Sequence, residues 1–528
     1  MNGSKPDFNP GRVILVGAGP GDPGLLTLRG QEALSQADVL VYDHLVTDQT
    51  LAHTSPHARR IYVGKVAGKH TMPQEAINEL LVNEAQQGNR VVRLKGGDPF
   101  IFGRGGEECL ALHEAGVPFE VVPGISAMAA VPAYAGIPLT SRDHATAFHV
   151  ITGHEHAFKP NDHVDWKQAA QLKGTLVIFM GLYRLRSITD ALMREGRSPD
   201  TPAAVVHWGT LPRQQTVSGT LATLADQVEH IQLRPPALLI IGEVVQLREA
   251  LNWFERRALF GRHIAIPRPR NQQSRLKRFL IEAGAQVHDI PAQATPPQKP
   301  IEPDPLPDLE GFQGVLFPGP EYVPPFMRAL LEQGVDARGL AGKKLIAVGS
   351  AVQSALRTAG LQADFTQDIL CTAELHKNWP EQIDIRGQSI LVPFGAEQPT
   401  ALFKELRLLN AQPLPWQTLV DAPPASTQPH APERFDAFAF PCASMITPMV
   451  KHMGEDHFRE HVKHTAVAVT SAKAARRLRQ LGANLIICPE EATVPAMVKA
   501  LIAYLQRPQG TQSTPHSGNR VDMAQETR

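Results

Sequence analysis

Short runs of apolar residues alternate with amphipathic segments along most of the chain. Residues 12–16 read RVILV, a run of strand length, and the glycine-rich turn GAGPGDPG follows at 17–24. A helical pattern over 25–37 leads to a second apolar run, DVLVY, at 38–42. Strands that alternate with helices in this way predict parallel or mixed sheets covered on both faces. We therefore expect an α/β protein.

The chain of 528 residues is too long for one hydrophobic core, because single domains rarely exceed about 250 residues. The alternating pattern predicts a first module over 11–261, divided into subdomains of about 11–146 and 147–261. A second module is expected over 262–506. Its start coincides with a new strand-like run, HIAIPRPR, at 263–270.

The second module contains a faint internal repeat. FQGVLFPGPEYVPPFMRALLEQG begins at Phe312, and FDAFAFPCASMITPMVKHMG begins at Phe435. Each stretch reads as an apolar strand, a turn containing Phe-Pro, and a helix. The repeat predicts two similar α/β lobes, and the alternative is a chance alignment of common α/β units.

The ends, charge and cysteines limit the class of protein. Residues 1–10 are expected to form a flexible tail, and residues 507–528, rich in Gln, Thr, Ser, Pro and Gly, a disordered one. Lys+Arg and Asp+Glu both total 52, so there is no basic excess for nucleic acid. No apolar run is long enough to span a membrane, and the polar start resembles no signal peptide. Four scattered cysteines indicate a reduced, cytoplasmic protein.

The turn after the first strand superficially matches the dinucleotide fingerprint G-x-G-x-x-G, and Asp43 lies where a ribose-binding acid would follow. The third glycine of that fingerprint is Asp22 here, and Pro20 removes an amide. A carboxylate is unsuited to the place where a pyrophosphate would rest. A dinucleotide-dependent oxidoreductase is therefore a weak alternative.

A second glycine-rich stretch is more specific. Residues 92–108 read VRLKGGDPFIFGRGGEE, in which two glycine pairs allow the backbone to approach a ligand closely. Asp98 offers a carboxylate for ribose hydroxyls or an amino group. The apolar turn PFIF between the glycine pairs is expected to be buried, which would distinguish the stretch from an ordinary surface loop.

These blocks occur in a recognisable order together with VYDHLV, YVGKVAGKH, VVPGISAMAAVPAYAGIPLTSRD, TGH and FMGL. Over about Gly11 to Phe254 the chain resembles the uroporphyrinogen-III C-methyltransferases, which form part of the tetrapyrrole methylase family. The resemblance implies two α/β subdomains with the active site in the cleft between them. It also implies S-adenosylmethionine (S-adenosyl-L-methionine) as methyl donor and a homodimer formed through this module.

The resemblance also assigns residues. The family's cofactor-binding positions correspond to Pro20, Gly96, Gly97, Asp98, Ile101, Ser126, Ala127, Met180 and Gly209. For Met180 the alternative is ordinary core packing. Asp43 corresponds to the family's proton acceptor and Lys65 to its proposed donor. Methyl transfer to a pyrrole carbon needs in-line placement, and a nearby carboxylate can accept the ring N–H proton.

Uroporphyrinogen carries eight carboxylates, so several cations are expected around the cleft. The basic residues of the matched blocks are Arg29, Lys65, Lys69, Arg93, Lys95, Arg104 and Arg142. They either bind these carboxylates or lie on the solvated surface. No metal site is expected, because His154, Glu155 and His156 on a loop do not form a ligand set.

From 262 to 506 the chain resembles the uroporphyrinogen-III synthases, a family with two α/β lobes joined by two strands. It departs from that family at 317–320 and 440–442, where FPGP and FPC replace a Thr/Ser-rich turn. Two readings therefore stay open for this module. It either converts hydroxymethylbilane to uroporphyrinogen III or is a degenerate relative that serves binding or assembly.

The expected fold is an N-terminal two-subdomain tetrapyrrole methylase fold followed by a two-lobed α/β uroporphyrinogen-III synthase-like module. The expected activity is C-methylation of uroporphyrinogen III at two ring carbons to give precorrin-2, for sirohaem or cobalamin biosynthesis. Two further alternatives are a non-catalytic tetrapyrrole carrier or sensor and a methylase that acts on a later corrin intermediate.

Overall fold

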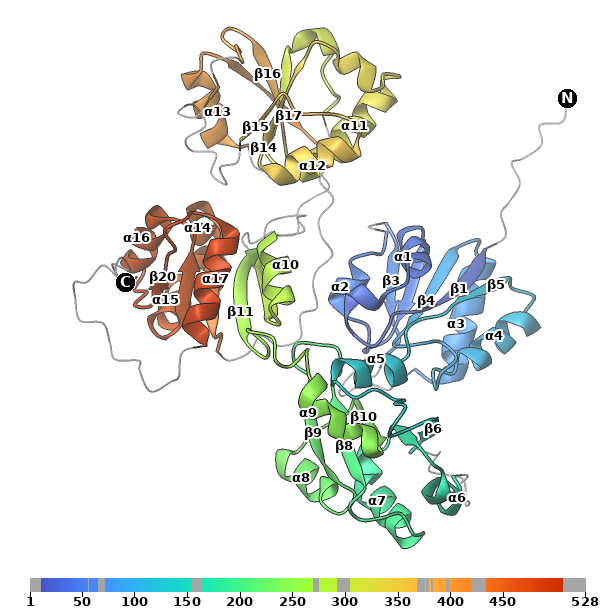
Figure 1. Cartoon of the computed structure of the whole chain (residues 1–528). Helices are drawn as coiled ribbons and strands as arrows, with labels where there is room; N and C mark the ends of the chain where they lie inside the picture. The colour runs from blue at the N-terminus through green and yellow to red at the C-terminus, as the bar shows by residue number, and fades with distance from the viewer. Residues whose placement is uncertain are drawn as a thin grey trace, which may run out of the picture.

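A computed structural model arranges the chain in four α/β lobes, each built around one five-stranded sheet (Figure 1). The model describes residues 11–55, 57–64, 72–153, 164–268, 275–291, 304–367, 376, 379–380, 383–395, 398–418 and 434–506. Both predicted tails and Lys65 lie outside the described residues. No helix in the described part of the chain is long and apolar enough to cross a membrane.

Every sheet is covered on both faces. Successive residues of a strand point to opposite sides of the sheet, so neighbouring apolar residues pack into two different buried clusters. In the second sheet, Leu176 and Ile178 belong to one buried cluster, while Val177 between them belongs to another. The same division gives each of the other sheets two clusters among the described residues. The predicted α/β class, with sheets covered on both faces, is confirmed.

The first lobe contains a wholly parallel sheet with strand order β3-β2-β4-β1-β5. Its strands are β1 (Arg12–Gly17), β2 (Val39–Tyr42), β3 (Arg59–Tyr62), β4 (Arg90–Lys95) and β5 (Phe119–Val122). Its helices are α1 (Leu28–Ser35), α2 (Asp48–Leu51), α3 (Gln74–Gln86) and α4 (Gly105–Glu114). Because the strands are parallel, the loops that follow them meet at one edge of the sheet.

The second lobe contains a mixed sheet with order β6-β7-β10-β8-β9, in which only β6 and β7 pair in parallel. Its strands are β6 (Phe148–Thr152), β7 (Thr175–Phe179), β8 (Pro202–His207), β9 (Gln215–Thr220) and β10 (Ala237–Ile241). Its helices are α5 (Ala127–Tyr134), α6 (Trp166–Gln171), α7 (Leu185–Arg194), α8 (Leu224–Ile231) and α9 (Arg248–Leu251).

Helix α5 connects the first two lobes. Its N-cap Ser126 follows the loop after β5, whereas Val131, Ala135 and Ile137 are buried in the core of the second sheet. Residues before 147 therefore already pack with the second lobe. The boundary predicted near 146 stays a prediction.

The predicted repeat is confirmed in the third and fourth lobes, whose sheets have orders β12-β11-β18-β19-β20 and β15-β14-β13-β16-β17. The third lobe has β11 (His263–Arg268), β12 (Gln286–Pro291), β18 (Ala437–Phe440), β19 (Ala466–Val469), β20 (Ile486–Ile487), α10 (Arg275–Glu282), α14 (Ile446–Met453), α15 (Glu455–His464), α16 (Ala472–Gln480) and α17 (Val494–Leu505). The fourth lobe has β13 (Gly314–Phe317), β14 (Lys344–Val348), β15 (Phe365–Gln367), β16 (Ser389–Phe394), β17 (Gln412–Gln417), α11 (Val323–Glu332), α12 (Ser350–Thr358) and α13 (Thr400–Leu408).

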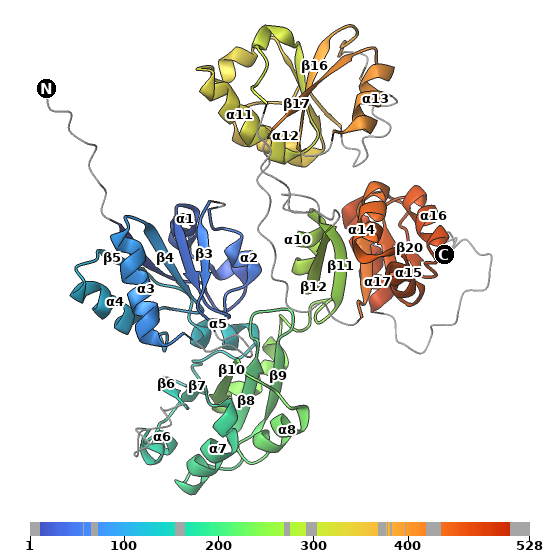
Figure 2. The ribbon, with the colours of Figure 1, turned by 180° about the vertical axis from the view of Figure 1, so that it is seen from behind.

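The two lobes differ by a permutation of the chain. The two repeated stretches supply the central strands β13 and β18, and β14 and β19 are their neighbours. The other half of the fourth-lobe sheet is β16–α13–β17, which follows the repeated stretch in the chain. The other half of the third-lobe sheet is β11–α10–β12, which precedes the repeated stretch. The third lobe is therefore closed by segments that are distant in sequence, and β11 pairs with β18 (Figure 2).

Candidate functional site

Three loops of the first lobe converge at the carboxyl edge of its sheet, after β1, β4 and β5. Gly97 N donates to Gly19 O at 2.7 Å, and Gly19 N donates to Gly97 O at 3.2 Å. A Cβ at Gly124 would lie 2.3 Å from Gly97 O and 2.6 Å from the Cα of Gly17. The sequence needs glycine here because the three backbones touch directly.

Asp98 joins two of these loops. Its Oδ1 accepts a hydrogen bond from Phe100 N at 2.8 Å, and its Oδ2 accepts one from Gly124 N at 3.1 Å. The carboxylate therefore has a structural role in the β4 loop. Its predicted contact with the cofactor stays a prediction.

The start of α5 lies beside the same loops. A Cβ built on Gly97 would be 3.8 Å from Ala127 N, and Ser126 Oγ accepts from Met128 N at 3.4 Å as the helix N-cap. Five of the predicted cofactor positions, from the β4 loop and the first turn of α5, are thus brought together: Gly96, Gly97, Asp98, Ser126 and Ala127.

The second lobe meets the first at Asp22. Asp22 N donates to Thr210 Oγ1 at 3.1 Å, and the hydroxyl of Tyr134 donates to Asp22 Oδ2 at 2.7 Å. Burial, and then Asp22, raise the pKa of the Tyr134 hydroxyl, which keeps it a donor. The acid that breaks the dinucleotide fingerprint is therefore a contact between lobes. Tyr134 and Thr210 were missed by the sequence reasoning, although they lie in the AYAGIPLTSRD block and beside Gly209.

Met180 and Gly209 belong to the second lobe, and of the two Met180 lines the cavity described below. Met180 directly follows β7 and is 47% exposed, so the alternative of core packing is wrong. A Cβ at Gly209 would lie 2.5 Å from Val131 Cγ1, so only glycine lets the β8 loop pass α5 at this distance. Pro20 and Ile101, in the β1 and β4 loops, are partly exposed.

Backbone strain is concentrated in the loops that follow β4, β7 and β8. Among the described residues, seven that are not glycine have positive φ, and five of these lie in those loops: Phe102, Arg104, Met180, Trp208 and Thr210. Bulky or β-branched residues adopt this conformation only at an energetic cost, and such strain is concentrated at functional sites. The guanidinium of Arg213 lies over the ring of Trp208 in a cation–π contact, 3.6 Å from the ring centroid.

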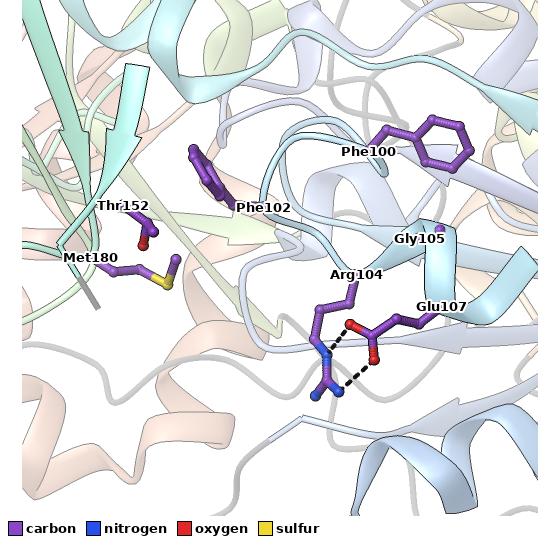
Figure 3. A pocket seen from close by; sticks show the side chains of 8 residues that line it. Phe100, Phe102, Arg104, Gly105, Glu107, Thr152 and Met180 are labelled. Atoms are coloured by element: carbon purple, nitrogen blue, oxygen red, sulfur yellow. Dashed lines mark hydrogen bonds and ion pairs between the residues drawn. The ribbon is translucent and has the colours of Figure 1, made fainter. Parts of the chain in front are cut away.

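A cavity of about 560 Å³ opens between the β4 loop and the ends of β6 and β7. Figure 3 shows Phe102, Thr152 and Met180 on one side of this cavity and Arg104 with Glu107 on the other. Arg104 donates from Nε and a terminal nitrogen to the two oxygens of Glu107, at 2.9 and 2.7 Å. The cavity therefore combines apolar and charged walls.

The expectation that PFIF is buried holds for Pro99 but is wrong for both phenylalanines. Phe100 is 57% and Phe102 44% exposed. Gly103 and Gly105 pack against the backbone of Pro99, and φ is positive at Phe102, so the loop closes on itself and turns the rings outward. The ring of Phe102 instead meets Phe179 of β7, with centroids 5.0 Å apart. Apolar character alone did not distinguish a buried turn from one facing a cleft.

Asp43 follows β2 at the same edge of the sheet. Its Oδ1 accepts from Leu45 N at 3.1 Å, and its Oδ2 lies 3.8 Å from a terminal nitrogen of Arg93. Arg93 and Lys95 were expected either to bind substrate or to be solvated, and neither expectation holds. Both are 4% exposed, because Glu108 pairs with them inside the lobe.

The remaining predicted cations differ in their surroundings. Arg29 pairs with Glu120 on the surface, and Arg142 is exposed. Lys65, Lys69 and the residues His154 to His156 lie outside the described residues. In the part of the chain that the structure describes, no three His, Cys, Asp or Glu side chains gather as a metal site would require.

Two family models cover most of the chain. The model of the Tetrapyrrole (Corrin/Porphyrin) Methylases matches residues 12–225, and that of Uroporphyrinogen-III synthase HemD matches 274–499. The Uroporphyrinogen-III C-methyltransferase of Bacillus subtilis is 42% identical over 333 residues, which cover 63% of this chain and 68% of that protein. The chain belongs to the tetrapyrrole methylase family. The predicted S-adenosylmethionine-dependent methyltransferase class is thus confirmed at the level of the family.

Two further relatives match different shares of the chain. The Porphyrin biosynthesis protein HemD of Ruminiclostridium josui is 39% identical over 369 residues, covering 68% of this chain and 71% of that protein. Siroheme synthase 2 of Cronobacter sakazakii is 51% identical over 251 residues, 48% of this chain and 54% of its own. The predicted methylase fold followed by a synthase-like module agrees with these matches.

A solved structure is also similar in sequence. The uroporphyrin-III C-methyltransferase from Thermus thermophilus, complexed with S-adenyl homocysteine, is 42% identical; the match covers 45% of this chain and 100% of that one, with a TM-score of 0.39.

Proposed function

We propose that the N-terminal module transfers methyl groups from S-adenosylmethionine to two ring carbons of uroporphyrinogen III, giving precorrin-2. One observation supports this above the others. The β4 loop, which holds four predicted cofactor positions, lines one cavity together with Met180 of the second lobe. The strained backbone of the loops after β4 and β7 marks the same place.

The residues present fit the cofactor. A Cβ at Gly97 would meet nothing nearer than 3.8 Å, so space remains beside the first turn of α5, and Ile101 and Met180 add partly exposed apolar surface. The proposed holders are Pro20, Gly96, Gly97, Asp98, Ile101, Ser126, Ala127, Met180 and Gly209. S-adenosylmethionine supplies the methyl group as an electrophile when bound. Asp43 accepts the ring N–H proton as the new carbon–carbon bond forms.

The cleft also suits an acidic tetrapyrrole. The cavity pairs the aromatic rings of Phe100 and Phe102 with the guanidinium of Arg104. Apolar rings can pack against a pyrrole. The guanidinium of Arg104 donates to both oxygens of Glu107, and it would exchange that partner to bind a substrate carboxylate through two hydrogen bonds. Asp22 is bonded to Thr210 and Tyr134, which disfavours a dinucleotide at the β1 turn.

The experiment that tests this function compares Asp43→Asn with Glu32→Gln, an exposed carboxylate on α1 of the same lobe. The full chain is assayed without oxygen for methyl transfer to uroporphyrinogen III. We expect Asp43→Asn to lower kcat about 100-fold or more, because a general base contributes that much. The Kd for S-adenosylhomocysteine should stay within about twofold, and Glu32→Gln should match the wild type. Substrate binding without turnover in the wild type would favour a carrier or sensor instead.

For the second module we propose uroporphyrinogen-III synthase activity on hydroxymethylbilane. This rests on its two lobes, each with a five-stranded sheet, in the region that the HemD family model matches. The test supplies hydroxymethylbilane and identifies the uroporphyrinogen isomer. The type III isomer supports an active synthase, whereas only the type I isomer would mean a degenerate lobe retained for binding or assembly.

A further inference from the structure

A group of buried charges lies directly behind Asp43. Arg93 and Lys95 are two positions apart on β4, so their side chains leave the same face of the sheet. Glu108 on α4 is 0% exposed and accepts from Arg93 Nε at 3.1 Å and from Lys95 Nζ at 2.8 and 2.9 Å. Gln74 on α3 also donates to Glu108, at 3.3 Å.

The charges of this group do not balance without Asp43. Arg93 and Lys95 contribute two positive charges, and Glu108 contributes one negative charge. A buried net charge is costly in the interior of a protein. Asp43, whose Oδ2 lies 3.8 Å from Arg93, is the carboxylate that neutralises the group while keeping 24% of its side chain exposed.

We infer that Arg93, itself held by Glu108, is a positioning residue that orients the Asp43 carboxylate for proton transfer. This inference rests on the proposed function. It concerns how the proton acceptor is prepared, and it gives Arg93 no contact with substrate or cofactor.

The hydrogen bonds fix both partners. Arg93 donates from Nε to Glu108 and from one terminal nitrogen to the carbonyl of Leu94 at 3.2 Å, so its other terminal nitrogen can face Asp43. On the other side, Leu45 N donates to Asp43 Oδ1 at 3.1 Å. Each carboxylate oxygen therefore has a partner, and its plane is set before substrate arrives.

Other titratable groups also surround Asp43. Tyr62 on β3 has its pKa raised by burial and then by Asp43 and Tyr42, so its hydroxyl stays protonated at neutral pH. The pKa of Lys95 is lowered by burial and by Arg93, while Glu108 opposes that shift. Together with Glu108 and Arg93, they form the titratable surroundings of Asp43.

The test replaces Arg93 in the full chain and uses Arg59→Gln as a matched control. Arg59 also pairs with a glutamate of the first lobe, Glu84 on α3, but belongs to a separate ion pair. We expect Arg93→Gln to lower kcat about 10- to 100-fold, with KM for uroporphyrinogen III and Kd for S-adenosylhomocysteine within about twofold. Arg93→Lys should recover part of kcat.

A kcat for Arg93→Gln equal to that of Arg59→Gln would overturn the inference alone. If Arg93→Gln does not fold, the double variant Arg93→Gln/Glu108→Gln removes one charge of each sign and keeps the group neutral. That variant should show the same loss of kcat with KM for uroporphyrinogen III within about twofold, and a kcat equal to that of the wild type would overturn the inference. Absence of methylated product from the wild type would overturn the proposed function and this inference together.

Discussion

Two individual carboxylates of the first lobe, Asp22 and Asp98, hold loops together through hydrogen bonds. Asp22 binds Thr210 and Tyr134 across the two lobes, and Asp98 accepts from two backbone amides. From the sequence, Asp22 was interpreted as a residue that disfavours a dinucleotide, and Asp98 as a cofactor ligand. The sequence could not reveal their partners, because Asp22 and Thr210 are 188 positions apart and meet only in the folded chain.

A histidine of the third lobe should make stability depend on pH. His288 on β12 is 8% exposed, and its Nε2 lies 3.0 Å from His263 Nδ1. Burial, and then His263, lower the pKa of His288 to about 4. The pKa of a histidine in the unfolded chain is about 6.5. Between these values the unfolded chain binds more protons, so stability present above about pH 6.5 is lost as pH falls towards 4.

The check is the urea midpoint of the third lobe measured across this pH range. The wild type should lose up to about 3 kcal/mol on acidification. His288→Gln should flatten the dependence, whereas His113→Gln, an exposed histidine of α4, should leave it unchanged. An equally steep loss in His288→Gln would show that other groups dominate.

Among the elements, the convergence of the loops after β1, β4 and β5 defines the cofactor side of the cleft. The glycine pairs of the β4 loop were recognised from the sequence because only glycine permits such close approach. Strand β9 (Gln215–Thr220) was missed, since its sequence QTVSGT is largely polar and one residue of it is buried. The outward orientation of the two rings in PFIF was also missed. The apolar sequence gives no sign of the positive φ at Phe102 that accompanies their exposure.

Two glycines in this region should respond in opposite ways to alanine. A Cβ at Gly124 would collide with the backbones of Gly97 and Gly17, at 2.3 and 2.6 Å. We therefore expect Gly124→Ala to lower the free energy of unfolding by about 3 kcal/mol and to weaken S-adenosylhomocysteine binding at least about tenfold. Gly106, in the first turn of α4, has nothing within 4 Å of such a Cβ.

The control Gly106→Ala should raise the free energy of unfolding by about 0.5 kcal/mol, because alanine is a better helix former. Thermal unfolding and titration calorimetry measure both effects. Cofactor binding by Gly124→Ala at the affinity of the wild type would contradict the description of the three loops.

For the whole molecule, the segment between α9 and β11 connects the methylase module to the third lobe through buried contacts. Phe254 is 2% exposed and touches the rings of Tyr134 and Phe260. Leu259 is fully buried in the core of the third lobe, and its N–H donates to Ala283 O at 2.8 Å. The predicted boundary at 261 and the homodimer stay predictions. The order of the modules was readable from sequence blocks, but this packing between them was not.

Removing the central ring should loosen this connection. Phe254→Ala deletes a buried aromatic side chain, which typically costs about 3 to 5 kcal/mol. We expect unfolding of the methylase module and of the third lobe to separate into two transitions, followed by calorimetry. Leu331→Ala on α11, which truncates a side chain that is 62% exposed, should leave the transitions as in the wild type. An unchanged profile for Phe254→Ala would show that the segment is only a tether.

The most direct test of the central claim is to count the methyl groups that the chain transfers. Purified protein is incubated without oxygen with S-adenosylmethionine and uroporphyrinogen III, and the products are analysed by mass spectrometry. We expect a tetrapyrrole that has gained two methyl groups, with S-adenosylhomocysteine formed in twice the molar amount of that product. Unmodified uroporphyrinogen III from a protein that binds S-adenosylhomocysteine would contradict the proposed substrate.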